Sequence, residues 1–202
     1  MLNTLIDFVF PARCIICGKS PSLLCTTCEP VARPGEFELD GVEGTYIFDY
    51  KDVSEVISDF KDKLKLGHAK FLSERLATHL QALVREQSID LILIPGSSRE
   101  NYKKRGFTPG QHLVAKALRR SGVQVPVGRL RRTREVKDQR ALGAHQRRQN
   151  VAGTMAAGNV FQKRILLFDD VLTTGATLTE MIRAVTSAGG QVVGICVLAK
   201  RN

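Results

Sequence analysis

Hydrophobic and polar positions follow their clearest pattern in the last third of the chain. A short apolar run at 165–168 is typical of a buried strand, and 191–198 is a second run of this kind. Between them, one helical face is formed by Leu178, Met181, Ile182 and Val185. Gly189 and Gly190 would end that helix. The segment is therefore predicted to be a strand, helix, strand unit with a right-handed crossover.

The middle of the chain continues this alternation of strands and helices. Residues 45–50 alternate β-branched and aromatic side chains, which predicts a strand. The apolar run within 90–95 is too short for a helix and is typical of a buried parallel strand. A helix is predicted between the two strands from Leu72, Leu76, Leu80, Leu83 and Val84. Strands separated by helices indicate an α/β fold, in which helices cover both faces of a parallel sheet.

The length of the chain, 202 residues, suits one mid-sized domain with a small appendage. We expect a short amphipathic helix at 1–10, a cysteine module at 11–32, a linker at 33–44 and the main domain at 45–202. The first segment is apolar, but it has no positively charged leader and carries Asp7, so we do not expect a signal peptide. The linker is expected because Pro, Gly and acidic residues follow the cysteines with little periodicity.

The composition is ordinary for a globular protein except for its charge. Thirty Lys and Arg residues stand against 20 Asp and Glu residues, and the net charge of +10 attracts polyanions such as nucleotides, pyrophosphate or nucleic acid. From Arg129 to Arg148, eight basic residues accompany only Glu135 and Asp138, and this run could be a binding face. No stretch approaches the roughly 20 apolar residues of a membrane-spanning helix, so we expect a cytoplasmic protein without a membrane span.

The segment 165–177 carries the strongest chemical signal. Its strand delivers Asp169 and Asp170 to the carboxyl end of the sheet, where open α/β sheets bind ligands. The turn at 173–177 then opens a helix whose free N–H groups suit a phosphate, and Gly175 lets the backbone approach it closely. Carboxylates are acceptors, so they suit ribose hydroxyls or a divalent cation. The pattern predicts a sugar phosphate site and, without a Gly-Lys-Ser/Thr ending, differs from the NTPase P-loop.

Four of the five cysteines form two Cys-x-x-Cys pairs, which are Cys14 with Cys17 and Cys25 with Cys28. This arrangement can place four sulfur atoms around one ion, and structural zinc is the expected ion. Two disulfides or an iron–sulfur cluster are the alternatives, and the disulfides are disfavoured because we see no export signal. The fifth, Cys196, lies in an apolar run and is expected to be a buried small hydrophobic residue.

The segment 165–177 resembles, at every position, the phosphoribosyl pyrophosphate (PRPP) signature of the type I phosphoribosyltransferases. With a cysteine module before it, the chain resembles the ComF family, which includes proteins of DNA uptake in competent bacteria and GntX-type proteins. Residues 104–107 are similar to the Arg-Gly-Phe motif of that family, and Pro95 precedes the position of its pyrophosphate loop. The Gln-x-x-Leu and Arg-x-x-Asn spacing of the family occurs at Gln139, Leu142, Arg147 and Asn150.

The resemblance implies a role for each group of residues. Asp169 and Asp170 would bind ribose hydroxyls, and the 5′-phosphate would be bound by Thr173, Thr174, Gly175, Ala176 and Thr177. Pyrophosphate with Mg²⁺ would be held by Ser97, Ser98 and Arg99. No side-chain nucleophile is implied, although Arg105 could close over the leaving group. The expected loop or nucleic-acid contacts are Lys103, Lys104, Arg105, Gln139, Arg147 and Asn150.

The chain departs from the family pattern in three places. Residues 93–96 replace a Val-Pro-Val-Pro type of sequence, Thr108 and Pro109 replace the usual Asn-Gln, and 31–44 contains no second cysteine group, which implies a single zinc ion. The resemblance implies a ComF-like protein that binds PRPP with Mg²⁺ and acts in DNA uptake or nucleic-acid handling through single-stranded DNA, with competence proteins as partners. The alternative is an active phosphoribosyltransferase that uses a nitrogenous acceptor.

Overall fold

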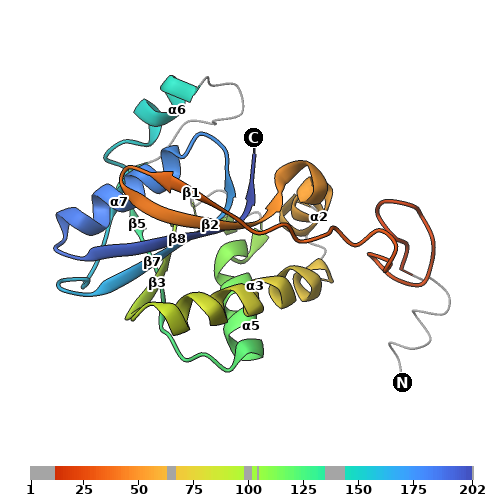
Figure 1. Ribbon diagram of the computed structural model, residues 1–202. Helices are drawn as coiled ribbons and strands as arrows, with labels where there is room; N and C mark the ends of the chain where they lie inside the picture. The colour runs from red at the N-terminus through yellow and green to blue at the C-terminus, as the bar shows by residue number, and fades with distance from the viewer. Residues whose placement is uncertain (1–11, 63–66, 98–101, 104, 135–143, 202) are drawn as a thin grey trace.

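The computed structural model of the chain describes residues 12–62, 67–97, 102, 103, 105–134 and 144–201 (Figure 1). The amphipathic helix expected at 1–10 lies outside these residues. A six-stranded sheet with the strand order β1-β2-β8-β7-β3-β4 forms the centre of the fold. Its strands are β1 (Gly35–Leu39), β2 (Val42–Asp49), β3 (Leu91–Ile94), β4 (Val127–Arg129), β7 (Arg164–Leu172) and β8 (Gln191–Lys200).

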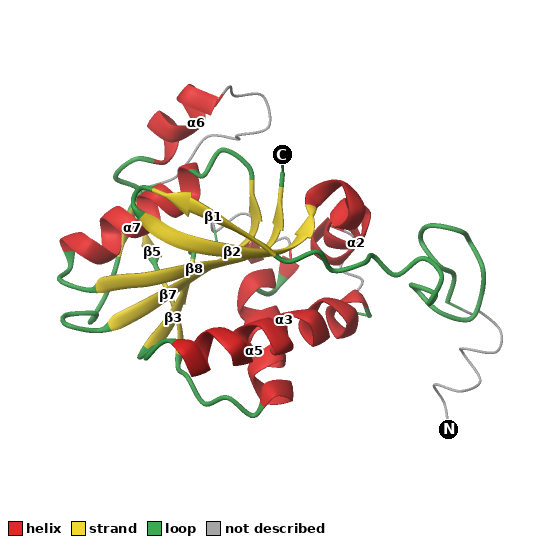
Figure 2. Ribbon diagram, viewed as in Figure 1, coloured by secondary structure: helices red, strands yellow, loops and turns green. Residues whose placement is uncertain are grey.

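Neighbouring strands of this sheet are parallel, apart from β1 and β2, which are antiparallel. Helices cover both faces (Figure 2). One face packs against α2 (Tyr50–Asp62), α3 (His68–Glu86) and α5 (Pro109–Ser121), and the other packs against α7 (Ala176–Ser187). A further helix, α6 (Ala144–Val151), lies beside α7. The predicted α/β fold is confirmed. Within the described residues, no helix has the length and apolar character needed to cross a membrane.

The central strands contribute to the hydrophobic cores on both faces, because successive side chains point to opposite sides of the sheet. In β7, Leu166 and Phe168 pack in the core with α2, α3 and α5, whereas Ile165 and Leu167 pack in the core with α7. All four side chains are fully buried. A strand that is buried on both faces needs apolar residues at every position, which explains the uninterrupted hydrophobic run in the sequence.

The prediction of a linker at 33–44 is wrong, because most of this segment belongs to a β-hairpin. In β1, apolar residues that pack toward α7 alternate with exposed acidic residues. Asp40 and Gly41 join β1 to β2 with φ angles of 51° and 77°, the conformation that a two-residue hairpin turn requires. The strand predicted at 45–50 accordingly begins earlier, at Val42.

A separate two-stranded antiparallel sheet is formed by β5 (Arg131–Arg132) and β6 (Met155–Ala156). We call the chain from β5 to β6 the basic arm; it contains α6 and also residues 135–143, which lie outside the described part. Next to the paired strands, the Thr133 N–H donates to Thr154 O at 2.9 Å. Backbone pairing between β5 and β6 therefore fixes the base of the basic arm.

Candidate functional site

Both carboxylates of the predicted sugar phosphate site lie near the carboxyl end of β7. The sequence predicted a strand that ends at Phe168, but β7 continues to Leu172, so Asp169 and Asp170 are themselves strand residues. β7 is parallel to β3 on one side and to β8 on the other. The carboxyl ends of these strands therefore meet at one edge of the sheet, where open α/β sheets bind ligands.

The two carboxylates have different electrostatic surroundings. The carboxyl group of Asp169 is shielded from water and lies beside Asp170, which raises the pKa of Asp169 to about 7. Asp170 contacts the ammonium group of Lys61, whose Nζ atom lies 2.5 Å from Asp170 Oδ2. The N–H of Asp170 donates to Asp169 Oδ1 at 2.9 Å, which fixes the orientation of that carboxyl group. Asp169 therefore changes its charge near neutral pH while Asp170 is paired with a cation.

The turn after β7 forms a small cavity, which we call the phosphate cradle. It has a volume of about 20 Å³ and is lined by the turn 173–177 together with Asp169. Gly175 precedes the first residue of α7 and has a φ of 75°, in the left-handed region that favours glycine. This N-cap residue has no side chain and cannot itself cap the helix, and Ala176 N lies 3.5 Å from Thr174 Oγ1. The N–H groups of the first turn and the positive end of the helix dipole suit a phosphate group.

A wider cavity of about 260 Å³ adjoins the phosphate cradle, and the two share Asp169 and Thr177 in their linings. Elements that are far apart in the sequence line this wide cavity: the end of β7, the segment after β3 and the first turn of α5. Among the described residues, three cationic side chains also line it, from Lys61, Arg105 and Arg132. If a molecule extended through both cavities, its middle part would therefore lie beside the paired carboxylates.

The segment after β3 contacts the base of the basic arm at Gly96. Arg132 Nε, from the base of the basic arm, donates to Gly96 O at 2.6 Å. A Cβ atom at Gly96 would lie 2.3 Å from Leu130 O, a backbone atom that cannot move aside on its own. Glycine is therefore required where the two backbones meet.

The predicted pyrophosphate residues are only partly within the described chain. Ser97 lines the wide cavity, and its Oγ lies 3.3 Å from Thr108 Oγ1, which links this segment to the N-cap residue of α5. Arg129 Nη1 lies 3.5 Å from the same hydroxyl oxygen. Ser98 and Arg99 lie outside the described residues.

Arg105 is half-buried and lines the wide cavity. The next residue, Gly106, has a φ of 73°, and its N–H donates to Tyr102 O at 2.7 Å. A helical turn therefore ends just before α5, and Arg105 in this turn lines the cavity. Lys103, on the same turn, is exposed, and Lys104 lies outside the described residues.

The residues predicted on the basic arm have a different location. Arg147 and Asn150 belong to α6, which lies beside α7, and Asn150 is half-buried. The side chain of Arg147 and all of Gln139 lie outside the described part of the chain. Asn150 does not line the wide cavity, and among the described residues of the arm it is Arg132 that does so.

Glu180 fixes the base of the basic arm to α7. Its side chain is 3% exposed and accepts hydrogen bonds from Gly153 N at 2.9 Å and from Met155 N at 2.8 Å. The guanidinium group of Arg183 donates to both carboxylate oxygens at 2.8 Å. Burial alone would raise the pKa of Glu180, but the hydrogen bonds from Arg183 and the two backbone N–H groups outweigh burial and lower the pKa. No sequence motif predicted this residue.

The side chains of the four clustered cysteines converge, and their Sγ atoms all lie within 4.8 Å of one another. The Sγ atoms of Cys17 and Cys25 are 3.7 Å apart. Thiolates around one zinc ion at a Zn–S distance of ~2.3 Å would be separated by about 3.8 Å, so the spacing fits. Backbone N–H groups of Cys17 and Cys25 lower the pKa of Cys14 to about 6, which favours its ionised, metal-binding form. The cluster could hold a metal such as zinc.

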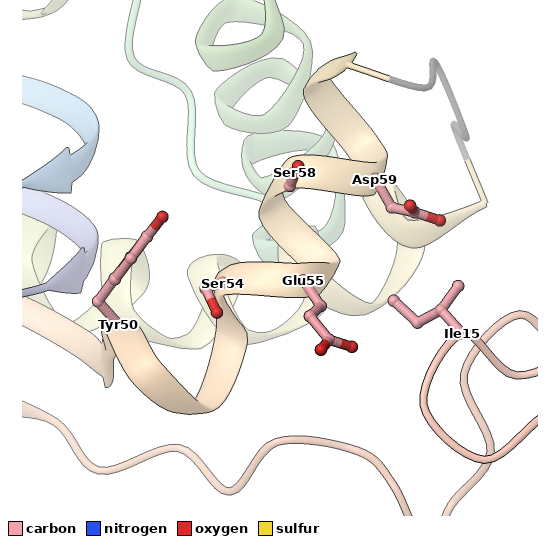
Figure 3. Close-up of a pocket in the computed structure, with 6 residues that line it drawn as sticks. All are labelled: Ile15, Tyr50, Ser54, Glu55, Ser58 and Asp59. Carbon is pink, nitrogen blue, oxygen red and sulfur yellow. The ribbon is translucent and has the colours of Figure 1, made fainter. Parts of the chain in front are cut away.

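A further cavity of about 430 Å³ lies where the cysteine module meets α2 (Figure 3). Ile15 of the module faces Glu55 and Asp59 of the helix across this space. The rest of the lining is polar and comes from Tyr50, Ser54 and Ser58. Of the predicted site residues that the structure describes, none lines it. The cavity marks the junction between the cysteine module and the helix that carries Lys61.

Three contributions to the wide cavity were missed by the sequence analysis: Lys61, Arg132 and the first turn of α5. Thr108 and Pro109 are the N-cap and first residue of α5, and this pair is a recognised helix-start signal that could have predicted the helix. No comparable signal distinguishes Lys61 or Arg132 from the many other basic residues of the chain.

Comparison with known proteins agrees with this architecture. Residues 103–202 match the family described as phosphoribosyl transferase domain. Over 187 residues the chain is 27% identical to the protein named competence protein ComFC of Streptococcus pneumoniae, and the alignment covers 90% of this chain and 77% of that protein. A 40-residue segment is 45% identical to an orotate phosphoribosyltransferase of Desulforamulus reducens, but it spans only 20% of this chain and 21% of that enzyme.

The solved structures that match the chain include an adenine phosphoribosyltransferase from Thermoanaerobacter pseudethanolicus. It is 21% identical to this chain with a TM-score of 0.42, and the match covers 84% of this chain and 83% of that one. The chain has a type I phosphoribosyltransferase fold, and its phosphoribosyl transferase domain, its similarity to ComFC and its four-cysteine cluster are consistent with a ComF-type protein.

Proposed function

We propose that this ComF-type protein binds PRPP together with Mg²⁺. The supporting observation is the junction at Asp169 and Thr177, where the phosphate cradle meets the wide cavity. This arrangement suits a molecule with a phosphate at one end, vicinal hydroxyls in the middle and a second anionic group at the other end. PRPP has these groups in this order.

Each part of PRPP has a counterpart in the site. The turn 173–177 would bind the 5′-phosphate through N–H groups and threonine hydroxyls, and the paired aspartates would accept hydrogen bonds from the ribose hydroxyls. The diphosphate would lie toward Gly96, where Arg105, Arg132 and the positive end of the α5 dipole offset its charge. Mg²⁺ bound with the diphosphate would neutralise further negative charge.

Calorimetric titration with PRPP and Mg²⁺ tests this proposal. Asp169→Ala and Asp170→Ala are each expected to weaken binding by about tenfold or more, because the ribose hydroxyls lose a charged acceptor. Asp52→Ala is the matched control, since Asp52 forms a solvent-exposed ion pair with Arg33 at 3.1 Å, and such pairs contribute little. Wild-type affinity in both aspartate variants, or no binding by the wild-type chain, would contradict the proposal.

We further infer that the protein handles single-stranded DNA, in a role related to DNA uptake and in contact with competence proteins. The support is the net charge of +10, the basic arm and the similarity to a protein named competence protein. Arg131 and Arg148 on the arm are exposed, and α6 is polar throughout most of its length. Contacts between this arm and DNA phosphates would make the affinity fall steeply as salt concentration rises.

Fluorescence anisotropy with a labelled single-stranded oligonucleotide at several salt concentrations tests the second proposal. The double variant Arg131→Gln, Arg148→Gln is expected to bind more weakly, with a salt slope reduced by about 0.7 for each lost phosphate contact. The control is Arg119→Gln, Arg120→Gln, which removes the same charge from the last turn of α5. Absent or salt-independent binding by the wild-type chain would end this proposal.

Transfer of a phosphoribosyl group to a nitrogenous acceptor is the alternative use of the same site. Such a reaction releases pyrophosphate, with catalysis by positioning and charge stabilisation. A coupled pyrophosphate assay with candidate nucleobases separates the two. Release that requires both PRPP and a base, and that is lost in Asp170→Ala, would establish a transferase. PRPP binding without release under any of these conditions would support the binding role.

The cysteine module has a structural part in this proposal. Four thiolate ligands leave a zinc ion without an open coordination position, so zinc would stabilise the fold of the module rather than take part in chemistry. Elemental analysis of the purified chain is expected to give one zinc ion per chain. Replacement of Cys17 by Ser should lower this ratio without abolishing PRPP binding, because the cluster lines neither the phosphate cradle nor the wide cavity.

A further inference from the structure

Lys61 forms a close ion pair with one of the two paired carboxylates. It lies in the last turn of α2, and its Nζ atom is 2.5 Å from Asp170 Oδ2. The Lys61 and Asp170 side chains are 22% and 21% exposed, so water only partly screens this ion pair. The ammonium group is therefore a fixed part of the site rather than a solvated surface charge.

Lys61 lies on the side of the site that the wide cavity forms. It lines the wide cavity, with Gly96, Arg105 and Arg132, but it does not line the phosphate cradle. The preceding residue, Phe60, is buried and packs against Phe107 with ring centroids 5.9 Å apart. This aromatic contact holds the end of α2 against the segment that carries Arg105, so the two cations enter the cavity from neighbouring elements.

An ammonium group has three N–H donors, and the contact with Asp170 needs only one of them. A diphosphate that enters the wide cavity approaches two adjacent carboxylates, which would repel it unless nearby cations offset their charge. We propose that Lys61 is a further ligand-binding residue, which neutralises Asp170 and donates hydrogen bonds to the diphosphate of PRPP. This inference rests on the proposed PRPP site and adds to it the residue that lets an acidic site accept a polyanion.

Calorimetry with three ligands tests this role: PRPP with Mg²⁺, pyrophosphate with Mg²⁺, and ribose 5-phosphate. Lys61→Met keeps the length and apolar stem of the side chain but removes the charge. We expect it to raise the Kd of PRPP and of pyrophosphate by about tenfold or more, and to change the Kd of ribose 5-phosphate by less than about twofold. Lys61→Arg keeps the charge and should restore most of the affinity.

The control variant is Lys51→Met, on the same helix, because Lys51 is exposed and lines neither the phosphate cradle nor the wide cavity. An equal loss of affinity for all three ligands would mean that Lys61 only orients Asp170, and unchanged affinity for all three would mean that it has no role; either result overturns the inference. If thermal melting shows that Lys61→Met is poorly folded, Lys61→Gln replaces it in the same titrations.

The titrations distinguish a wrong role for Lys61 from a wrong proposed function. If the wild-type chain binds pyrophosphate but neither PRPP nor ribose 5-phosphate, the PRPP function is wrong, and the pyrophosphate titration still decides the role of Lys61. If the wild-type chain binds PRPP and ribose 5-phosphate, but Lys61→Met binds all three ligands normally, only the role of Lys61 is wrong. If the wild-type chain binds none of the ligands, both the PRPP function and the role of Lys61 are wrong.

Discussion

The phosphate cradle and the wide cavity are built in different ways, although they share a wall. The cradle is formed by residues that follow one another along the chain at the end of β7 and the start of α7, and its shape depends on the left-handed backbone at Gly175. The wide cavity is assembled from α2, the segment after β3, the first turn of α5, the basic arm and β7. Local backbone geometry governs the cradle, whereas tertiary packing governs the cavity.

This difference has a practical consequence, because each half can be examined with its own ligand. Ribose 5-phosphate would occupy the cradle and the paired aspartates, pyrophosphate would occupy the wide cavity, and PRPP would occupy both. A substitution that acts on one half should therefore change the affinity for one of the small ligands and for PRPP, and leave the other small ligand unaffected.

The largest effect is expected from Gly175→Val. Its φ of 75° is unfavourable for a β-branched residue, and a Cβ atom would also lie 2.9 Å from Leu39 Cδ1. The turn would have to change its backbone conformation and withdraw N–H groups from the phosphate. Calorimetry should show a loss of about 100-fold for ribose 5-phosphate and PRPP, and little change for pyrophosphate.

Gly158→Val is the control for that experiment, because a Cβ atom at Gly158 has no neighbour within 4 Å and its φ is not in the left-handed region. A loss of pyrophosphate binding as large as the loss of ribose 5-phosphate binding in Gly175→Val would show that the two halves are not independent. In that case the cradle would be part of one cooperative site.

Gly96→Ala is expected to give the opposite pattern with a smaller effect. The added Cβ atom would lie 2.3 Å from Leu130 O, so the segment after β3 would have to shift relative to the base of the basic arm. The bond from Arg132 Nε to Gly96 O would be disturbed as well. Affinities for pyrophosphate and PRPP should fall on the order of tenfold, while ribose 5-phosphate should bind normally. Loss of ribose 5-phosphate binding alone would be inconsistent with our assignment of the diphosphate to this side.

Asp169 belongs to the wall that both cavities share, so ligands that contact it should show the same pH dependence of binding. Asp169 has a pKa of about 7, and in the proposed site its ionised form would accept hydrogen bonds from ribose hydroxyls, so protonation would compete with binding. Affinities for ribose 5-phosphate and PRPP should rise about fourfold from pH 6.5 to pH 8, and pyrophosphate should lack this component. Asp169→Asn should bind weakly at all pH values and flatten the profile; an unchanged profile would assign the titration to another group.

The sequence was sufficient for the half of the site that depends on local structure. An apolar run predicts β7, and the acidic pair and the threonine and glycine turn, to which we assign the phosphate and ribose contacts, are consecutive residues. The β-hairpin was missed even though Asp40 and Gly41 are a strong hairpin signal, because the surrounding Pro, Gly and acidic residues were interpreted as a linker.

The other half could not be predicted, because its residues become neighbours only in the folded sheet. Arg132 reaches Gly96 because β5 begins directly after the strand that pairs with β3. Lys61 reaches Asp170 because α2 packs on the face of the sheet that bears Phe168, the residue before the acidic pair. Neither residue lies in a local motif, and one basic side chain among 30 Lys and Arg residues carries no positional signal.

The smallest effect on binding is expected from Glu180→Gln, which loosens the wide cavity from a distance. Glu180 receives the N–H groups of Gly153 and Met155 on different carboxylate oxygens, and an amide in its place would present an N–H₂ group to one of these donors. The free energy of unfolding should fall by about 1–3 kcal/mol. PRPP affinity should fall about threefold, because the base of the arm also carries Arg132, and ribose 5-phosphate affinity should not change.

The stability difference between wild type and Glu180→Gln should itself depend on pH. The folded-state pKa of Glu180 is lower than its ordinary value of 4.5, so its contribution to stability is present above that value and is lost as the pH falls through the folded-state pKa. Chemical denaturation at about pH 7 and about pH 3 should therefore give a large difference at the higher pH and a small one at the lower pH. An equal difference at both values would mean that the shape of the side chain, rather than its charge, holds the arm. In that case the contrast between a local cradle and a distributed cavity would extend no further than the residues that line them.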